Sequence, residues 1–321
     1  MARHHAIVEV LRAEARAGVV PFVRLIEAAL YQPGLGYYVS DRIRVGKTAG
    51  TDFTTAAALG SMFGELLAAS AQTLVGETSR HTLVEVGAEP GQDHLAGVAS
   101  AFAALLTFRV GSSPNLPSPA VLIANELLDA QPFHRFIYQQ GRWQELGVRV
   151  TGPSLTIEPL GEFSSERAAD FARGLPPVAE GWLLDVPLAA ETLLATLLAG
   201  GWSGAVILLD YGKTLAQCLD GSPAGTARAY RGHQLSGEIL ELLGSQDLTC
   251  HVLWDRLEPI LVAQGFRAVR LDRQEAFFVK TAASAMERII TSGDTEATGR
   301  LRALTHPAHF GAKFQVLSGI R

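Results

Sequence analysis

The chain has 321 residues, of which 48% are hydrophobic and 18% are charged, and its formal net charge is −5 at pH 7. Its 27 lysines and arginines are scattered, which argues against a nucleic-acid-binding protein or a membrane-surface protein. No run approaches the roughly 18 consecutive apolar residues of a membrane-spanning helix, so we expect no membrane insertion. These features predict a soluble protein with one large domain or two ordinary ones.

The chain contains two cysteines, Cys218 and Cys250, which lack the spacing of metal ligands. Two lone thiols favour a reducing compartment over a disulfide scaffold, and we expect no metal site. The first residues carry acids among their bases and lack a small-residue cleavage site. We therefore predict a cytoplasmic protein that begins with an amphipathic helix.

Helical patterns dominate the first 76 residues. Apolar residues at helix spacing predict a helix that follows Pro21 and ends at the turn Gln32-Pro33-Gly34. A second helix is expected from Leu59 to about Gly76, after a glycine-rich loop. We predict that residues 1–76 form an N-terminal helical segment packed on the core, and that residues 77–321 form an α/β domain.

Short apolar runs alternate with helical patterns in the rest of the chain. The predicted strands are 82–86, 107–110, 120–124 and 205–209, and a helix at 189–199 precedes the last of them. This alternation predicts an α/β fold with a doubly wound parallel sheet, in which ligands bind beyond the carboxyl ends of the strands. Alternating residues and a Gln-Gln-Gly turn predict an antiparallel insertion at about 133–185. Helices at 255–264 and 274–290 and a strand at 314–320 are expected to close the chain.

A glycine turn follows the first predicted strand, in VEVGAEPG (84–91). Gly87 and Gly91 would let the backbone approach a nucleotide-like cofactor, while the next helix would offer N–H groups. Such a turn alone is weak support, because many are only tight strand–helix connections. A nicotinamide-dependent oxidoreductase would need the same turn with a ribose-binding acid, and no other motif of the chain fits that class.

The succession of motifs is more specific than any one of them. In order they are PGLGYY (33–38), DFTT (52–55), FGELL (63–67), VEVGAEPG (84–91), ANELLDAQP (124–132), LLDYG (208–212), GTARAYRGH (225–233) and QDLTCHV (246–252). Over roughly residues 20–320 this succession resembles the MidA family, whose mitochondrial members are complex I assembly methyltransferases. The resemblance implies a class I, Rossmann-like methyltransferase fold, S-adenosylmethionine as cofactor and a protein arginine as methyl acceptor.

Three residues are candidates for catalysis. Methyl transfer needs no protein nucleophile, only alignment of the methyl group with the acceptor and exclusion of water. Carboxylates pair with the forked N–H donors of a guanidinium, so Glu126 and Asp129, which follow the strand 120–124, are the candidate clamp. His251 matches a family position in QDLTCHV. As alternatives, Asn125 and Glu126 could cap the following turn and the histidine could be structural.

The candidates for cofactor binding are Glu85, Gly87, Gly91 and Asn125. This half of the chain also departs from the family pattern. Glu89 stands where the family's turn has a glycine, Ala57-Ala58 replaces a Pro-Glu pair, and Gly111 stands where an acid would bind the ribose. Glu85 could take over the role of that acid.

Two hypotheses follow from these departures. The chain is either an active methyltransferase acting on a protein arginine, or an inactive member of the fold that serves as a protein-binding or assembly factor. The interval 111–119 is also shorter than the family's helix and loop. It would leave apolar surface uncovered, which favours a homodimer.

Overall fold

The computed structural model describes residues 2–39, 44, 60–90, 94–109, 112, 115–306, 311 and 313–321. Contacts divide the chain into two compact units, each made of three segments. Unit 1 comprises Met1–Arg42, Leu128–Thr192 and Lys213–Leu253, and unit 2 comprises Ile43–Leu127, Leu193–Gly212 and Trp254–Arg321. This grouping differs from the predicted division at residue 76, because the first two helices belong to unit 1 and the third belongs to unit 2.

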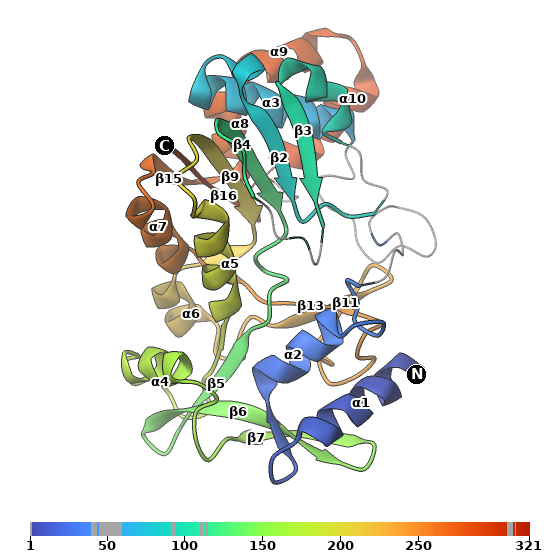
Figure 1. The fold of residues 1–321 in the computed structure, drawn as a ribbon, viewed down its shortest axis with the longest axis vertical. Helices are drawn as coiled ribbons and strands as arrows, with labels where there is room; N and C mark the ends of the chain where they lie inside the picture. Colours follow the sequence, from blue (N-terminus) through green and yellow to red (C-terminus); the bar gives the residue numbers. More distant parts are fainter. Residues whose placement is uncertain are drawn as a thin grey trace. The chain divides into compact units, whose positions relative to one another are not determined.

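Unit 2 contains a six-stranded sheet in the order β15-β16-β9-β4-β2-β3 (Figure 1). The strands are β2 (Thr82–Val86), β3 (Ala104–Phe108), β4 (Ala120–Asn125), β9 (Gly204–Asp210), β15 (Arg267–Arg273) and β16 (Gln315–Ile320). β3, β2, β4 and β9 pair in parallel, which confirms the predicted α/β fold. The closing strand β16 is antiparallel to both of its neighbours, so the sheet is mixed rather than wholly parallel.

The position of each strand in this sheet explains its sequence. β9 is buried at every residue and β4 at all but its last, as expected for central parallel strands covered on both faces. β3 lies at the edge, and Leu106 at its centre keeps 38% of its surface exposed. An uncharged, partly exposed edge strand can pair with another chain. The predicted homodimer stays a prediction.

Four helices share one hydrophobic core with the unit 2 sheet: α3 (Ser61–Val75), α8 (Gln274–Thr281), α9 (Ala283–Thr291) and α10 (Thr295–Thr305). The predicted helix 274–290 is interrupted at Ala282, which separates α8 from α9. The 3-10 helices η2 (Thr78–Arg80) and η3 (Ala96–Ala101) flank β2. Gly64 allows α3 to pack closely against the backbone of His94, because a Cβ there would lie 1.9 Å from the His94 carbonyl oxygen. α7 (Trp254–Ala263) packs against β15 and β16.

Unit 1 contains a mainly antiparallel sheet in the order β1-β6-β5-β8, with β7 paired to β6. Its strands are β1 (Val19–Pro21), β5 (His134–Gln139), β6 (Arg142–Thr151), β7 (Ser154–Pro159) and β8 (Leu183–Val186). The turn at Gln140-Gly141 joins β5 to β6, where both residues have positive φ angles. This arrangement confirms the predicted antiparallel segment at about 133–185. α4 (Glu166–Arg173) and α6 (Leu215–Gly221) close the core of this sheet.

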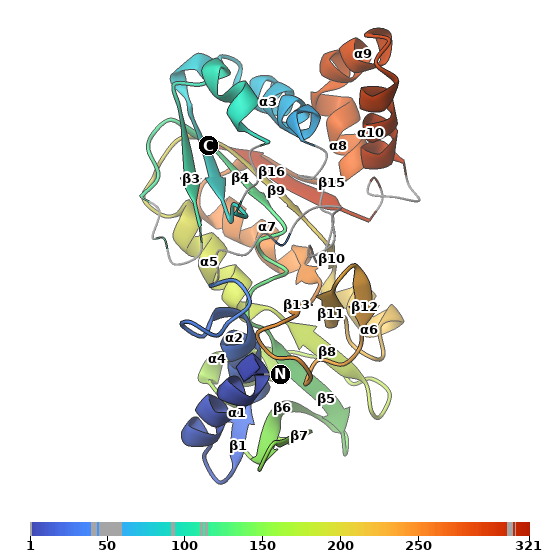
Figure 2. The ribbon, with the colours of Figure 1, turned by 90° about the vertical axis from the view of Figure 1, so that its right-hand side faces the viewer.

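The rest of unit 1 carries its second sheet and its first helices (Figure 2). α1 (Ala2–Glu14) packs against β6, and α2 (Phe22–Tyr31) packs against β5, β6 and β13. β11 (Arg228–Arg231) lies between β12 (Gln234–Ser236) and β13 (Asp247–Thr249), antiparallel to both. β10 (Gly212–Lys213) pairs with β14 (Val252–Leu253). α5 (Leu188–Leu198) begins in unit 1 and ends in unit 2.

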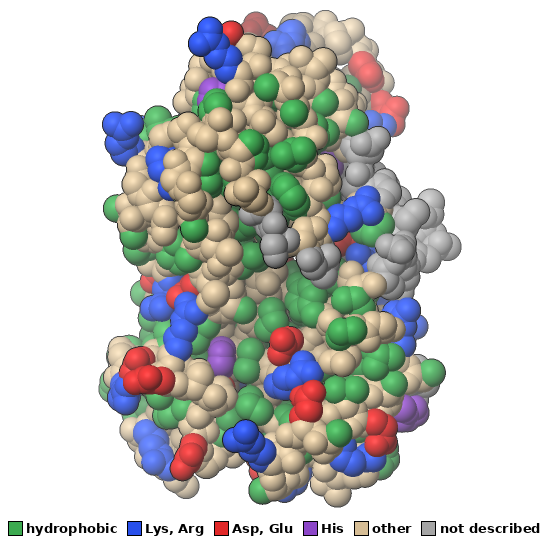
Figure 3. Space-filling view, viewed as in Figure 1, with side chains coloured by type: hydrophobic (Ala, Val, Ile, Leu, Met, Phe, Trp, Pro, Cys, Tyr) green, Lys and Arg blue, Asp and Glu red, His purple; other side chains and the backbone are tan. Residues whose placement is uncertain are grey.

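The surface carries charges of both signs. On the face shown in Figure 3, lysines and arginines alternate with aspartates and glutamates instead of forming one basic patch. A search of the described residues finds no helix that is long and apolar enough to cross a membrane.

Candidate functional site

The carboxyl ends of β2, β4 and β9 lie at one edge of the unit 2 sheet. They bring Gly87, Asn125 and Asp210 to this edge. Val86 pairs with Ala124, and Asn125 pairs with Leu209. Gly87 and Asn125 therefore continue adjacent parallel strands, and Asp210 ends the third. The sequence predicts ligand binding at this edge, because parallel strands all end there.

Gly87 makes the predicted turn after β2, with a φ angle of 86°. The N–H groups of Gly87 and Ala88 both donate to the carbonyl oxygen of Phe108 at the end of β3, at 3.0 and 3.3 Å. A Cβ at Gly87 would lie 2.9 Å from Cδ1 of Leu127, so that side chain covers the glycine. These two backbone donors are already used within the sheet, and an approaching ligand has to displace the end of the Leu127 side chain.

Glu85 lies on β2, and its carboxylate is 3.3 Å from Nε2 of His94. His94 is 6% exposed and its ring lies 5.5 Å from the ring of Phe63 on α3. Glu85 therefore contacts His94, and His94 in turn packs against α3. Its predicted cofactor role stays a prediction, while Gly91 and Gly111 lie outside the described residues.

Glu89, which replaces the family's glycine, is held by Arg44. The guanidinium Nε of Arg44 donates to the Glu89 carboxylate at 2.9 Å, and the arginine side chain is only 2% exposed. Burial raises the pKa of Glu89, although Arg44 and Arg109 both favour its charged form. The substitution therefore creates a buried ion pair beside the turn.

Asn125 is the last residue of β4, and Glu126 follows it directly. Oδ1 of Asn125 is buried and has no hydrogen-bond partner among the described residues, while its Nδ2 donates to the Glu126 carboxylate at 3.2 Å. Glu126 has a φ angle of 51°, a left-handed conformation that is uncommon for a residue other than glycine. Its N–H donates to the Leu209 carbonyl, which fixes this conformation against β9. Strained residues of this kind cluster at functional sites.

The described residues at this edge fit a cofactor with a hydrogen-bond donor, such as the ammonium group of S-adenosylmethionine. The observation that supports this fit is the buried Oδ1 of Asn125, which has no partner among the described residues. A buried acceptor is costly unless a hydrogen-bond donor satisfies it. The N–H groups of Gly87 and Ala88 are not available to a ligand, since both are bonded to Phe108.

The other two predicted catalytic residues, Asp129 and His251, are neighbours in unit 1. The N–H of Cys250 donates to the Asp129 carbonyl at 3.2 Å, and Asp129 is 5% exposed. The backbone N–H of His251 donates to the Thr226 hydroxyl at 3.2 Å. These contacts join the ANELLDAQP, GTARAYRGH and QDLTCHV motifs. The structure thus brings together residues that lie more than a hundred positions apart.

Electrostatics keep His251 uncharged. Burial lowers its pKa to about 4, and the positive charges of Arg228 and Lys213 contribute to the shift, while Asp185 opposes it. Near neutral pH the imidazole is therefore neutral. Its Nδ1 is buried and has no hydrogen-bond partner among the described residues.

Asp185 organises the backbone beside His251. Its carboxylate accepts from Nε and Nη2 of Arg135 at 2.7 and 3.2 Å, and from the N–H groups of Thr226 and Ala227 at 2.7 and 2.8 Å. Both charged side chains are almost completely buried. Thr226 in turn accepts a hydrogen bond from the backbone of His251. The Arg135–Asp185 ion pair therefore holds in place the loop that contacts the histidine.

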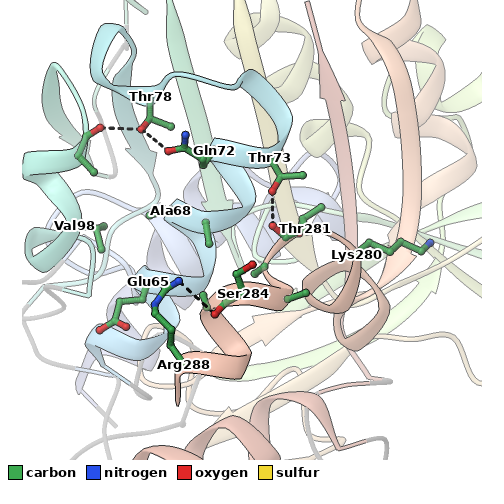
Figure 4. Close-up of a pocket in the computed structure, with 15 residues that line it drawn as sticks. Glu65, Ala68, Gln72, Thr73, Thr78, Val98, Lys280, Thr281, Ser284 and Arg288 are labelled. Carbon is green, nitrogen blue, oxygen red and sulfur yellow. Dashed lines mark hydrogen bonds between the residues drawn. The ribbon is translucent and has the colours of Figure 1, made fainter. Parts of the chain in front are cut away.

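A cavity of about 550 Å³ lies elsewhere on unit 2, between α3, η2 and the α8–α9 break (Figure 4). Polar side chains such as Gln72, Thr73 and Arg288 line it together with alanines. None of the predicted site residues lines this cavity. A search of the described residues finds no group of three or more histidine, cysteine, aspartate or glutamate side chains that could hold a metal ion.

Several residues at these sites were not predicted as functional from the sequence. Arg44 and His94 pair with Glu89 and Glu85 across distances in the chain that no local pattern reveals. Lys213 directly follows the LLDYG motif and Arg228 lies inside GTARAYRGH. Their positions within or beside these motifs were the sequence signal that could have marked them as site residues.

Comparisons with known proteins identify the family. A family model described as "Putative S-adenosyl-L-methionine-dependent methyltransferase" matches residues 56–271, about two thirds of the chain. The mitochondrial protein arginine methyltransferase NDUFAF7 of Danio rerio is 24% identical, with 94% of this chain and 83% of that protein covered. Its homologue in Drosophila melanogaster is 23% identical, with coverages of 98% and 85%.

Both of these relatives are mitochondrial proteins, which contradicts the predicted cytoplasmic location. That prediction was wrong because lone thiols and a mixed-charge N-terminal segment fit more than one compartment. The alignment to the Danio rerio protein spans 375 positions, more than the 321 residues of this chain. The relative therefore carries segments that this chain lacks.

A solved structure from Burkholderia thailandensis bound to S-adenosyl-homocysteine shares the fold, with a TM-score of 0.86 and 23% identity over 100% of this chain and 93% of that one. A second structure from the same organism has a TM-score of 0.82. These matches and the family model confirm the MidA-like resemblance of the motifs. The chain therefore belongs to the family of S-adenosyl-L-methionine-dependent methyltransferases.

Proposed function

We propose that this chain transfers a methyl group from S-adenosylmethionine to an arginine side chain of a protein. The observation that carries the proposal is the pair Asn125–Glu126 at the carboxyl end of β4, with a buried unpaired acceptor beside a carboxylate in a left-handed conformation. Relatives covered over more than four fifths of their length are named protein arginine methyltransferases, which supports the same acceptor.

In this proposal each polar residue has a specific task. Bound S-adenosylmethionine supplies the electrophilic methyl group. Oδ1 of Asn125 accepts a hydrogen bond from the amino group of the cofactor, while the Glu126 carboxylate accepts N–H groups of the guanidinium and orients one nitrogen toward the methyl group. The Asn125 Nδ2 bond to Glu126 keeps the two side chains in register. Glu85, Gly87 and Gly91 remain proposed cofactor-binding residues.

Asp129 and His251 are proposed to serve the acceptor. Asp129 is a buried acid linked through Cys250 to His251, and the histidine is neutral because its pKa is about 4. The partner in this reaction is a protein, and a role as an assembly factor without catalysis is the alternative outcome of the test below.

The first experiment is calorimetric titration of the purified chain with S-adenosylmethionine and S-adenosylhomocysteine. The proposal expects micromolar binding, followed by transfer of tritiated methyl groups to arrayed peptides with a central arginine. Matched peptides with lysine at the same position should stay unlabelled. No cofactor binding at millimolar concentration would refute the proposal and leave the non-catalytic assembly role.

A further inference from the structure

Lys213, Arg228 and His251 lie on or beside neighbouring short strands of unit 1, and the positive charges of Lys213 and Arg228 both act on the His251 ring. Lys213 lies on β10, which pairs with β14 directly after His251. Arg228 begins β11 opposite Thr249 of β13, two residues before His251. The backbone of His251 is also bonded to Thr226, two residues before Arg228. The pairings of β10 with β14 and of β11 with β13 thus bring the backbones of Lys213, Arg228 and His251 close together.

Neither cation of this group is neutralised within the described part of the chain. The Lys213 ammonium donates to the Ser222 hydroxyl at 2.7 Å, and neither Lys213 nor Arg228 has a carboxylate partner among the described residues. Asp185 is the acid whose charge acts on His251. Its four hydrogen bonds, to Arg135, Thr226 and Ala227, already use about all the lone pairs of a carboxylate.

His251 presents a donor at this point. Its Nδ1 is buried without a hydrogen-bond partner among the described residues, and a bare nitrogen there costs less than a buried N–H without an acceptor. We assign the proton of the neutral ring to Nε2 on this argument. The three side chains therefore offer one N–H donor and two cations.

This arrangement discriminates between ligands by charge. Two positive charges oppose a guanidinium, so the accepting arginine itself is a poor ligand for this group. An anion gains charge-assisted hydrogen bonds from Lys213 and Arg228 and a further bond from His251. The group is also partly exposed, so a ligand can reach it.

We propose that Lys213, Arg228 and His251 bind a carboxylate of the acceptor protein, supplied by an aspartate or glutamate side chain. The inference rests on the proposed function and deepens it, because it names the substrate class as an acceptor protein that carries an acid in addition to the methylated arginine.

The test uses the full chain and fluorescein-labelled peptides with one central arginine. A single glutamate is moved through the four positions on either side, and each peptide has a glutamine counterpart. Fluorescence anisotropy without cofactor measures binding, and tritiated S-adenosylmethionine measures methyl transfer. At one or more positions the glutamate peptide should bind about tenfold more tightly than its counterpart, with a preference that shrinks as salt is added.

Matched variants locate the effect. Arg228→Gln and Lys213→Gln should each reduce the preference for glutamate to less than about threefold. Arg231→Gln is the control, because Arg231 is exposed at the other end of β11 and should leave the preference unchanged. Equal binding of every glutamate and glutamine pair, absence of binding by all peptides, or an equal loss in Arg231→Gln would each overturn the proposal.

The outcomes separate this proposal from the function on which it rests. Methyl transfer without any preference for glutamate would leave the methyltransferase function standing and refute the carboxylate site. A preference that depends on Arg228, without methyl transfer, would keep the site and refute the proposed function. Sodium phosphate and sodium acetate serve as competitors, and displacement by phosphate alone would reassign the group to a free phosphate ligand.

Discussion

Two of the proposed functional residues, Glu126 in unit 2 and His251 in unit 1, differ in the charged groups around them. The carboxyl edge of the unit 2 sheet ends in acids, with Glu126 after β4 and the buried Asp210 at the end of β9. In unit 1, Lys213 and Arg228 surround the neutral His251. Acids suit the sulfonium of the cofactor and the guanidinium of an arginine, whereas the bases suit an anion.

Two buried polar groups, one in each unit, differ in how completely their hydrogen-bonding capacity is used. In unit 1, the buried Asp185 carboxylate has a donor for each of its hydrogen bonds, so it stabilises the fold. In unit 2, the buried Oδ1 of Asn125 has no hydrogen-bond partner among the described residues. A ligand donor or an ordered water can satisfy such an acceptor.

Asp185→Asn tests the matched network of unit 1. The change leaves the buried Arg135 guanidinium without its counter-charge, so the free energy of unfolding should fall by about 3 kcal/mol or more. Urea denaturation followed by circular dichroism measures this loss. The exposed Asp220 provides a control, since Asp220→Asn should change stability by less than about 0.5 kcal/mol. Similar small losses in both variants would remove Asp185 from the framework of unit 1.

The pH dependence of stability tests the neutral histidine. The folded pKa of His251 is about 4 and its ordinary value is 6.5, so between these values the unfolded chain binds a proton that the folded chain does not. Stability should therefore be fully present above pH 6.5 and decrease as the pH falls toward 4, by about 3 kcal/mol in total. His251→Asn should remove this part of the dependence in urea denaturation at several pH values.

Arg228→Gln sharpens the same measurement. Removing one positive charge that lowers the histidine pKa should bring that pKa closer to 6.5 and make the pH dependence smaller. Identical curves for wild type and His251→Asn would mean that the histidine carries no such shift. The contrast in charge between the two units would then lose its best electrostatic marker.

Local patterns in the sequence predicted much of the fold. The runs AVLIA and AVILL are apolar at every position, which is why β4 and β9 could be recognised as buried strands. The Gln140-Gly141 turn similarly revealed the β5–β6 hairpin. The break at Ala282 was missed because apolar residues continue at helix spacing on both sides of it. Hydrophobic periodicity predicts which face of a helix is buried, but it does not predict where the helix changes direction.

The partners of the site residues could not be predicted in the same way. Arg44 and Glu89 are 45 positions apart, and Arg135 and Asp185 are 50 apart. Only the folded chain brings such pairs together. The departure at Glu89 was visible in the sequence, whereas its compensation by a buried arginine was not. The division into units of three segments each is likewise a product of tertiary contacts.

Glu126→Gln tests the acid of unit 2 as the clamp of the acceptor. The amide keeps the size of the side chain but loses the charge that attracts a guanidinium, so methyl transfer should slow by about a hundredfold. Affinity for S-adenosylmethionine should stay nearly unchanged in calorimetry, since Asn125 is the proposed cofactor contact. Glu287→Gln on the exposed side of α9 is the matched control. Retained activity in the Glu126 variant would refute its catalytic role.

Asn125→Ala separates ligand binding from folding most directly. Because Oδ1 has no hydrogen-bond partner among the described residues, its removal should barely change the stability of the chain without cofactor. Among the described residues, the side-chain bond that is lost is the one from Nδ2 to Glu126. Affinity for S-adenosylmethionine should fall by about tenfold in calorimetric titration, while Asn115→Ala at an exposed position should leave it unchanged. A variant that is destabilised but binds the cofactor normally would show that Asn125 serves the fold. The unmatched acceptor would then no longer mark Asn125 as a ligand-binding residue.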